Sequence, residues 1–588
     1  MIQGNAQRAY LIIDELVRCG VNQFIIAPGF RSAPLALAAI SHPSTHVVVH
    51  FDERGSAFYA LGYGRTTLRP CVWITTSGTA VANGLPAVIE SSLDGVPMIC
   101  LTADRPPELR DTKSNQTIDQ IHIFGRYSRW FADLPAPEIN DYEPYIRSTI
   151  DYAVHKSLYG PVHLNCMFRE PLVEMNNEEQ SIPNFSWSTQ QGPHTRYATP
   201  MISTASEDAE LMKSILRAHR GLIVAGRFHA HEDGQAISEL VQQLDWPLFS
   251  DICAPIHSVN HSVNFFDLIL RSPSFKATYC PDAILYFGFP PVSKELQTYL
   301  SNASAERFIL VSPSSVRIDP FHVVTDRIQS SITEFCDLVK NNLTQHQSHT
   351  SWLDAWKRAD YTVENILSSD LSKEISEPAL AWLLSKLMAD TAWILGANSM
   401  PIRDLQTFYN RSQNSHVRVY ANRGASGIDG TLSTAAGISQ ADPRHGVILI
   451  GDLAMLHDIN SLSLLKERNV TIIAINNNGG GIFNMLPIAL KSEVFEKVLG
   501  TPHGYDFENA AKQFEIPYTK VNSCVEFQNV FSSASDLSGP CIIEVKTDRN
   551  HNANLHNTLF NRVNEAIHLI AQLPKIDSQD ASSQFSTK

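Results

Sequence analysis

Two apolar segments that each end in polar residues constrain the fold of this chain more than any other feature. Residues 447–450 have the composition of a buried strand, which is followed by a glycine and Asp452, and residues 470–475 form a second such strand before Asn477. Between them, residues 456–467 repeat apolar side chains with a helical period. A strand, a helix and a strand in this order return the chain to one edge of a parallel sheet, where ligands bind. The pattern predicts an open α/β sheet with both polar residues at that edge.

Oxygen atoms dominate the side chains expected at this edge. The Asp452 carboxylate, the Asn477 amide and the backbone carbonyl of Gly479 would supply three oxygen ligands, which Mg²⁺ prefers in an octahedral site. Two diphosphate oxygens and water would complete the octahedron. For either fragment alone an ordinary turn is the competing explanation, because Gly, Asp and Asn are favoured turn residues. The two fragments together predict a metal and diphosphate site.

A second acid follows a strand near the amino terminus. Residues 46–51 are mainly apolar and lead into Asp52 and Glu53, which begin a segment rich in Ala and aromatic residues. An acid stabilised by the dipole of a helix start is the simplest explanation for either carboxylate. The presence of the downstream metal motif favours a functional role for Glu53.

The paired motif resembles the signature of thiamine-diphosphate enzymes, and three further blocks resemble one branch of them. That branch is the 2-succinyl-5-enolpyruvyl-6-hydroxy-3-cyclohexene-1-carboxylate (SEPHCHC) synthases of menaquinone biosynthesis. The blocks are APGFRSAPL at 27–35, TSGTAVAN with LTADRPPEL inside 76–109, followed by Asn115-Gln116, and NRGASGIDG at 422–430.

The resemblance implies a fold and a cofactor set. It implies the thiamine-diphosphate-binding fold of three α/β domains with mainly parallel sheets, and thiamine diphosphate bound with Mg²⁺ or Mn²⁺. Glu53 is the implied catalytic residue, because in this family a glutamate hydrogen-bonds the aminopyrimidine ring and activates the cofactor. Ile428 would wedge beneath the cofactor and impose its bent shape. The implied cofactor contacts are Glu53, Gln116, Ile428, Asp452, Asn477 and Gly479, of which the last three would bind the metal.

The family reaction decarboxylates 2-oxoglutarate and adds the resulting succinyl carbanion to isochorismate in conjugate fashion, which gives SEPHCHC and CO₂. Because both substrates are dicarboxylates, a pocket for them needs fixed cations, and arginine holds a carboxylate with two parallel hydrogen bonds. The implied substrate contacts are Arg31, Arg105, Asn115, Lys294, Ser399, Arg403, Arg423, Ile482, Phe483 and Leu486.

Each of these residues also has a structural explanation. An ion pair with Asp104 competes for Arg105, and a solvated loop charge is the ordinary role of Lys294. Surface pairing competes for Arg403, and the apolar residues at 482–486 could instead form the core of a helix. Ser399 and Arg403 are four residues apart and so share one helix face.

Two positions depart from the family pattern. Phe30 stands where the family usually has serine, and Glu295 follows Lys294 where some members have a second basic residue. Both changes concern the isochorismate contacts and leave the cofactor residues intact. An acetohydroxyacid synthase type of decarboxylase or carboligase is the competing enzyme class, although the arginine set argues against it. A catalytically silent paralogue is the non-enzyme alternative.

Alternation of strands and helices divides the chain into three α/β domains. We expect a pyrimidine-binding domain at 1–175, a linker at 176–205, a central domain at 206–345, a diphosphate-binding domain at 352–573 and a flexible tail at 574–588. The resemblance implies a homodimer, or a dimer of such dimers, with Glu53 of one subunit and Asp452 of another meeting at the interface.

Composition limits the compartment and the partners. The net charge of −14, from 60 acidic and 46 basic residues, argues against nucleic-acid binding, which requires a basic surface. The nine cysteines are odd in number and form no Cys-x-x-Cys motif, which favours a reducing compartment without zinc. Residues 1–20 read as an amphipathic helix, and no apolar run is long enough to span a membrane. We therefore expect a cytoplasmic enzyme.

Overall fold

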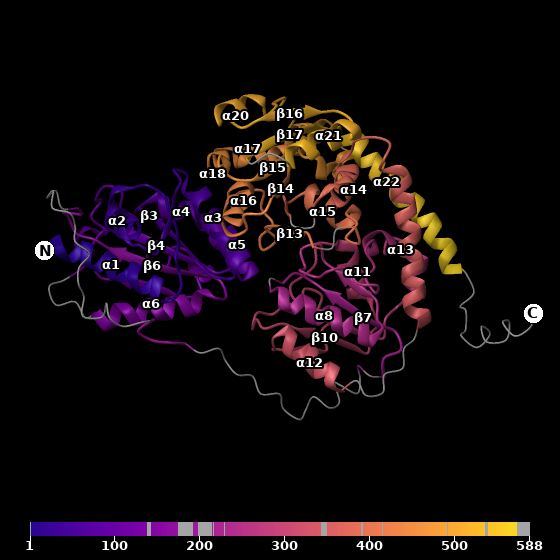
Figure 1. Ribbon diagram of the computed structural model, residues 1–588, viewed down its shortest axis with the longest axis horizontal. Helices are drawn as coiled ribbons and strands as arrows, with labels where there is room; N and C mark the ends of the chain where they lie inside the picture. Colours follow the sequence, from indigo (N-terminus) through magenta and orange to yellow (C-terminus); the bar gives the residue numbers. More distant parts are fainter. Residues whose placement is uncertain are drawn as a thin grey trace, which may run out of the picture. The chain divides into compact units, whose positions relative to one another are not determined.

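The fold contains three parallel sheets, which the computed structural model in Figure 1 shows along the chain. The structure describes residues 2–137, 143–173, 192–197, 215, 217–228, 230–342, 350–389, 392–413, 416–490, 492–535 and 539–572. These residues belong to two compact units. The first comprises Met1–Pro200, Asn422–Arg444 and Ala454–Val470, and the second Met201–Ala421, His445–Leu453 and Thr471–Lys588.

The first sheet has the strand order β2-β1-β3-β4-β6-β5 and lies in the first unit. Its strands are β1 (Gln23–Ile26), β2 (His46–Val49), β3 (Cys71–Thr75), β4 (Met98–Asp104), β5 (Phe131–Leu134) and β6 (Pro161–Met167). The helices of this unit are α1 (Ile2–Arg18), α2 (Ala33–Ser41), α3 (Glu53–Thr67), α4 (Thr79–Asn83), α5 (Leu85–Asp94), α6 (Glu143–Ser157), α16 (Thr431–Ala441) and α18 (Leu462–Leu465). Short 3₁₀ turns are η1 (Phe30–Ser32), η2 (Pro107–Leu109), η3 (Gly125–Tyr127) and η4 (Ile459–Ser461).

Helices cover both faces of this sheet because its strands are apolar on both sides. Side chains of α1, α2 and α6 form one core with alternate residues of β1, β3 and β4, such as Phe24 and Ile74. On the opposite face, the Trp73 indole of β3 donates a 2.9 Å hydrogen bond to Ser56 of α3. α16 packs against α3 at close range, because Gly62 and Gly437 carry no side chains where the two backbones meet.

The second sheet lies in the second unit, with the order β11-β10-β9-β7-β8. Its strands are β7 (Gly221–Ala225), β8 (Leu248–Ser250), β9 (Ala283–Phe287), β10 (Arg307–Val311) and β11 (Asp326–Ile328). The accompanying helices are α8 (His231–Leu244), α9 (Phe266–Ile269), α10 (Pro273–Thr278), α11 (Lys294–Asn302), α12 (Ile332–Asn342) and α13 (Thr350–Asp370).

The third sheet also lies in the second unit and has the order β13-β12-β14-β15-β17-β16. Its strands are β12 (Trp393–Gly396), β13 (Arg418–Tyr420), β14 (Gly446–Gly451), β15 (Val470–Asn476), β16 (Tyr518–Val521) and β17 (Cys541–Lys546). Its helices are α14 (Glu377–Leu387), α15 (Met400–Phe408), α17 (Asp452–His457), α19 (Ser492–Phe495), α20 (Glu508–Gln513), α21 (Cys524–Ser535) and α22 (Arg549–Gln572), which runs beside α13 (Figure 1). Between them lie the turns η5 (Gly481–Met485), η6 (Pro487–Leu490) and η7 (Glu496–Gly500).

The first and third sheets share one topology. Numbered from its own first strand, each sheet has the order 2-1-3-4-6-5, although the two sequences show no repeat. In each sheet the second strand lies on one side of the first strand and the third strand lies on the other side. The strand order therefore reverses between β1 and β3 in one sheet and between β12 and β14 in the other. Such switch points open a crevice at the carboxyl ends of the strands.

The predicted fold class of three parallel α/β domains is confirmed. One predicted element is wrong: residues 456–467 do not form one helix, because α17 ends at His457 and α18 starts at Leu462. Asp458 lies at the break, where its carboxylate accepts hydrogen bonds from Ser433 and Ser461. Such competing side-chain bonds disfavour helix continuation.

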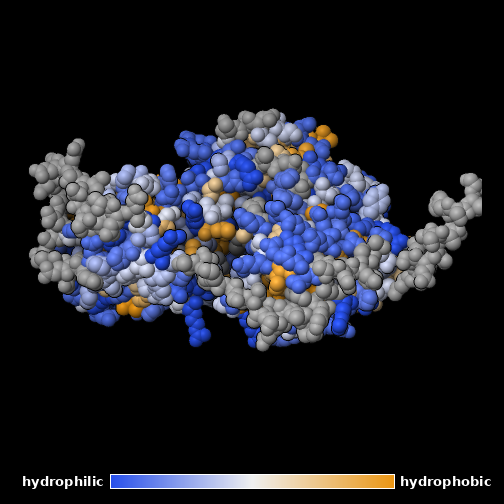
Figure 2. Space-filling view, turned by 60° about the horizontal axis from the view of Figure 1, so that its bottom comes forward, coloured by the Kyte–Doolittle hydropathy of each residue, from blue (hydrophilic) through white to orange (hydrophobic). Residues whose placement is uncertain are grey.

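The expected domain boundaries stay predictions. Most of the expected linker at 176–205 and the whole tail at 574–588 lie outside the described residues. Hydrophilic residues predominate on the face drawn in Figure 2, with apolar residues in small patches, as the acidic composition suggests. Among the helices that the structure describes, none combines the length and apolar character that a membrane crossing requires.

Candidate functional site

Asp452 lies at the carboxyl end of β14, next to the switch point of the third sheet, as predicted. It is the first residue of α17 and its side chain is buried. Its Oδ1 accepts a 2.7 Å hydrogen bond from the Leu453 N–H, and its Oδ2 accepts a 2.9 Å bond from the Gly479 N–H. A carboxylate in this position has two oxygens fixed by backbone donors, so its orientation is set before any ligand binds.

Asn477 follows β15, the strand next to β14, so the two predicted metal ligands end adjacent strands. Its Nδ2 donates a 2.8 Å hydrogen bond to Glu377 Oε1. Its Oδ1 is buried and has no hydrogen-bond partner among the described residues. A buried unpaired oxygen is costly unless a ligand satisfies it, so the donor set fits a hard cation.

Gly479 and His503 surround the same carboxylate. The Gly479 carbonyl accepts a 3.0 Å hydrogen bond from the Gly481 N–H, which leaves one lone pair for a ligand. His503 Nδ1 accepts from the Tyr505 N–H at 3.0 Å, so the hydrogen belongs on Nε2, which lies 3.1 Å from Asp452 Oδ2. His503 was not predicted, because a histidine in a Pro-His-Gly turn carries no metal-site signal.

Two buried carboxylates, Glu377 and Asp404, lie close to this edge of the third sheet. Glu377 is the first residue of α14, and burial together with the neighbouring Asp404 raises its pKa to about 7. Asp404 Oδ1 lies 2.9 Å from His556 Nε2, and both side chains are buried. Burial raises the pKa of the Asp404 carboxyl. None of these three residues was predicted, because nothing in their local pattern distinguishes them from core or cap positions.

Ser399 and Arg403 lie where they were predicted, after β12 at the switch point. Ser399 has a φ of 77°, in the left-handed region that serine rarely adopts. The Arg403 guanidinium donates to the Ser399 carbonyl, and burial lowers its pKa. The structure thus brings this pair together, with backbone strain of the kind that clusters at functional sites.

The apolar residues after the loop at 477–480 are not the core of a helix. Ile482 and Phe483 are half-buried in η5, a 3₁₀ turn with no buried residue, and Leu486 is exposed. Their partial exposure fits a wall that faces a ligand.

In the first unit, Glu53 begins α3 and is half-buried. Asp52 caps this helix, since its Oδ1 accepts from the N–H groups of Arg54 and Gly55. Glu53 therefore is not the capping acid, and its Oε2 accepts a 3.4 Å bond from Asn83. Asp52 thus has the capping role expected of an acid at a helix start, so capping does not explain the presence of Glu53.

Arg31 and Arg105 lie close together in the first unit, after β1 and β4. Arg31 is buried, donates to the Phe168 carbonyl at 3.0 Å and pairs with Glu170 at 2.8 Å. Arg105 donates to Ser77 Oγ and the Gln116 carbonyl, so the expected competing ion pair with Asp104 is not its main contact. Burial and the positive charge of Arg31 lower the pKa of Arg105. Asp104 pairs instead with Arg110 at 2.8 Å.

Asn115 and Gln116 lie in the exposed loop before Thr117. Gln116 has a φ of 54°, and its Nε2 donates to the Ser77 carbonyl at 3.0 Å. Gln116 thereby shares Ser77 with Arg105, whereas Asn115 is exposed to solvent.

A buried glutamate, Glu90, which was not predicted from the sequence, positions the loop with Arg423 and Ile428. Glu90 of α5 accepts hydrogen bonds from the N–H groups of Gly424 and Ala425 at 2.7 and 2.6 Å. Arg423 and Ile428 are both half-buried on this loop. Burial, with Asp94 nearby, raises the pKa of Glu90, and Arg65 pairs with both acids.

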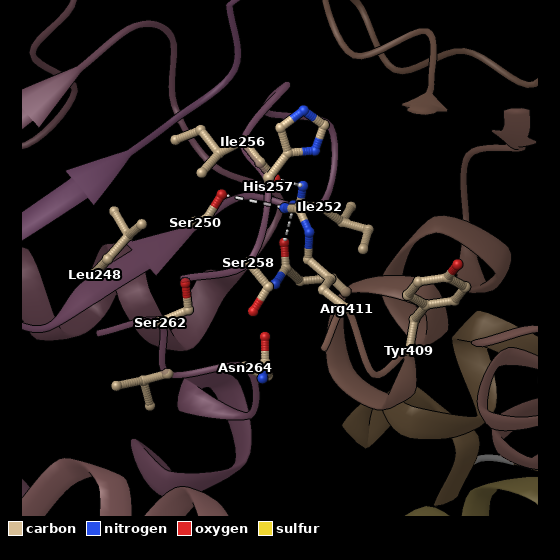
Figure 3. Close-up of a pocket in the computed structure, with 12 residues that line it drawn as sticks. Leu248, Ser250, Ile252, Ile256, His257, Ser258, Ser262, Asn264, Tyr409 and Arg411 are labelled. Carbon is tan, nitrogen blue, oxygen red and sulfur yellow. Dashed lines mark hydrogen bonds between the residues drawn. The ribbon is translucent and has the colours of Figure 1, made fainter. Parts of the chain in front are cut away.

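Lys294 is exposed at the start of α11 and, among the residues that the structure describes, contacts no other predicted site residue. Its neighbour Glu295 lies 3.7 Å from Arg271 and 3.9 Å from Lys276, so this departure from the family serves local ion pairs. Figure 3 shows a pocket of the second unit that none of the predicted residues lines. Arg411 lines this pocket, and its guanidinium donates to Ser250 and to the carbonyls of residues 251, 254 and 256.

Family models of thiamine pyrophosphate (thiamine diphosphate) enzymes match three parts of the chain. The N-terminal TPP binding domain matches residues 7–123, the middle domain 181–394 and the C-terminal TPP binding domain 402–545. The first and third matches contain Glu53 and Asp452. The chain is therefore a thiamine-diphosphate enzyme.

Relatives of nearly equal length carry one name, 2-succinyl-5-enolpyruvyl-6-hydroxy-3-cyclohexene-1-carboxylate synthase. The protein of Rubrobacter xylanophilus is 43% identical over 94% of this chain and 97% of its own. Those of Salinibacter ruber and Chlorobium phaeobacteroides are 41% and 40% identical, over 95% and 93% of this chain and 96% and 95% of their own. The chain belongs to the 2-succinyl-5-enolpyruvyl-6-hydroxy-3-cyclohexene-1-carboxylate synthase family.

Proposed function

We propose that this protein releases CO₂ from 2-oxoglutarate and adds the remaining four-carbon unit to isochorismate, which gives SEPHCHC in menaquinone biosynthesis. The observation that carries the proposal is 43% identity over 94% of the chain to a protein named for this product. When bound, thiamine diphosphate supplies a nucleophilic carbon and an electron sink for decarboxylation. The remaining work is binding and orientation by this chain's own residues.

Asp452, Asn477 and the Gly479 carbonyl would hold Mg²⁺ or Mn²⁺ with the diphosphate. The Asn477 Oδ1 supports this role, because it is buried without a hydrogen-bond partner among the described residues and a divalent cation would satisfy it. Glu53 would hold a proton at the aminopyrimidine ring nitrogen, and Ile428 would support the cofactor from below. Gln116 would add a polar contact.

Paired cations would hold the substrate carboxylates. Burial and the positive charge of Arg31 lower the pKa of Arg105, and a bound dianionic ligand would favour the charged guanidinium. Ser399 and Arg403 would bind a further carboxylate, with Arg423, Asn115 and Lys294 as additional polar contacts. Ile482, Phe483 and Leu486 would form the apolar wall against the isochorismate ring.

We further propose a homodimer or a dimer of dimers in the cytoplasm, with each active site formed by two subunits. The nine cysteines are all free in the structure, which supports a reducing compartment.

The test is CO₂ release and product mass from the purified protein with thiamine diphosphate, Mg²⁺ and 2-oxoglutarate, with and without isochorismate. We expect an isochorismate-dependent adduct that the Glu53→Gln variant does not form. A preference for pyruvate over 2-oxoglutarate would indicate an enzyme of the acetohydroxyacid synthase type. Bound cofactor without turnover on any of these substrates would indicate a catalytically silent paralogue.

A further inference from the structure

We propose that Glu377 is a positioning residue for the metal: it orients the Asn477 amide so that Oδ1 faces the ion. The inference rests on the metal site proposed above. Glu377 lies 100 residues before Asn477 in the sequence, at the start of α14, and makes none of the proposed metal contacts itself.

Of the two polar atoms of the Asn477 side-chain amide, only the nitrogen has a hydrogen-bond partner among the described residues. Asn477 Nδ2 donates to Glu377 Oε1 at 2.8 Å, whereas Oδ1 is buried and has no partner among the described residues. An amide group is planar, so a fixed nitrogen also fixes the direction of the oxygen. The pair therefore aims an unsatisfied acceptor away from Glu377.

A carboxylate selects this orientation and excludes the opposite one. Glu377 Oε1 accepts hydrogen bonds from both Asn477 Nδ2 and Thr547 Oγ1, so a rotation that placed Asn477 Oδ1 against it would bring two acceptors together. A glutamine at 377 would lose this selectivity, because its own amide can present either a donor or an acceptor.

Glu377 is itself held from two directions. It begins α14, whose Ser376 cap accepts from the Ala379 N–H at 3.3 Å, so the carboxylate lies at the positive end of an 11-residue helix. Thr547, which follows β17, donates from Oγ1 to the same Oε1 at 3.1 Å. The Thr547 N–H also donates to the Asn476 carbonyl at 3.1 Å, which ties this support to the strand that presents Asn477.

A second glutamate offers a matched control. Glu544 is also buried, and its Oε1 accepts a 2.9 Å hydrogen bond from the amide of Asn476. This pair has the same chemistry one residue earlier on β15, but Asn476 is not a proposed metal ligand. The Glu544→Gln variant therefore reproduces the cost of placing glutamine in a buried glutamate site.

The experiment measures Mn²⁺ affinity by calorimetry and electron paramagnetic resonance in the full chain with thiamine diphosphate. We expect Glu377→Gln to bind Mn²⁺ about 10 to 100-fold more weakly, as for other outer-shell partners of metal ligands, and Glu544→Gln to bind within about 3-fold of the unmodified protein. We also expect high Mg²⁺ to restore kcat in Glu377→Gln. Equal Mn²⁺ affinity in Glu377→Gln and the unmodified protein would overturn the proposal.

A variant that leaves Glu377 in place tests the proposal independently of how well Glu377→Gln folds. Asn477→Asp places a carboxylate against Glu377, so we expect weaker Mn²⁺ binding although a carboxylate is the better ligand. Combining it with Glu377→Gln restores one donor and one acceptor, and we expect the affinity to recover by at least about 10-fold over Asn477→Asp. Undiminished affinity in Asn477→Asp would contradict the orientation role.

Mn²⁺ binding and SEPHCHC formation together distinguish a failure of the proposed function from a failure of the positioning role of Glu377. If the unmodified protein binds no Mn²⁺ with the cofactor, the proposed metal site fails and the positioning role with it. If it binds Mn²⁺ but forms no SEPHCHC, the proposed function fails while the effect of Glu377 on affinity still decides the positioning role.

Discussion

The Asp452 carboxylate accepts a 2.9 Å hydrogen bond from the Gly479 N–H, which joins the end of β14 to the loop after β15. This bond fixes the only acid among the proposed metal ligands. The remaining ligands, Asn477 and the Gly479 carbonyl, lie on the same loop. The proposed metal site thus depends on two adjacent strands of one sheet.

Asp452→Asn should abolish tight metal binding. The substitution removes the negative charge and can place an amide N–H against the Gly479 N–H. We expect Mn²⁺ affinity in the presence of thiamine diphosphate to fall on the order of 100-fold, measured by calorimetry. Asp506→Asn, an exposed acid of the same unit, serves as the control and should bind normally. Unchanged affinity in Asp452→Asn would remove it from the ligand set.

Glu53→Gln should separate cofactor binding from turnover. Glutamine keeps the shape of the side chain but cannot exchange a proton with the aminopyrimidine ring. We expect kcat to fall roughly 10² to 10⁴-fold, with thiamine diphosphate still bound in calorimetry. Glu508→Gln, at an exposed site on α20, should retain full activity. A Glu53→Gln variant with normal kcat would show that another group activates the cofactor.

Arg105→Gln should weaken substrate binding more than it slows the reaction. The variant loses a charge-assisted contact, which contributes about 1.5–3 kcal/mol, and it leaves Arg31 as the remaining cation of the pair. We expect KM for one dicarboxylate substrate to rise about 10 to 100-fold in steady-state assays. The exposed Arg69 provides a control, since Arg69→Gln should leave KM unchanged. A normal KM for both substrates in Arg105→Gln would assign Arg105 to structure alone.

Two substitutions at Ser399 separate backbone strain from the hydroxyl. Its φ of 77° favours glycine, so Ser399→Gly should be about 1 kcal/mol more stable than Ser399→Ala in thermal unfolding. Both variants lack the hydroxyl, and we expect both to raise KM equally. If only the alanine variant raises KM, the backbone conformation and not the hydroxyl matters for binding.

His163 should make the first unit sensitive to acid. Burial lowers the pKa of His163 from 6.5 to about 3, and its Nδ1 is buried without a hydrogen-bond partner among the described residues. The folded state therefore favours the neutral ring, so its stability is full above pH 6.5 and falls as the pH drops towards 3. We expect a loss of about 2 kcal/mol between pH 6.5 and 5 from this group.

Urea unfolding at pH 7 and pH 5 tests this expectation. His163→Gln can keep the donor to Thr102, which His163 Nε2 contacts at 2.7 Å, but cannot be protonated. We expect a smaller shift of the unfolding midpoint between the two pH values in this variant. His46→Gln, an exposed histidine of β2, should behave like the unmodified protein. An equal shift in His163→Gln would mean that other groups cause the acid sensitivity.

Local pattern was sufficient to predict the strands that carry the site. The predicted strand segments 447–450 and 470–475 lie inside β14 and β15, because short apolar runs bounded by polar turns specify buried strands. Since these strands are parallel, the residues that follow them gather at the carboxyl edges of the sheets. The positions of Asp452, Asn477, Glu53 and Ser399 were therefore predictable from the sequence by itself.

Only the tertiary structure decided what surrounds these residues. Glu377 reaches Asn477 across 100 positions, and Glu90 reaches Gly424 across 334. Helical periodicity indicates which face of a helix is buried, but it does not specify the partner of a buried charge, which depends on how distant elements pack. For the same reason the break at Asp458 was not predicted, since its hydrogen bond to α16 exists only in the folded chain.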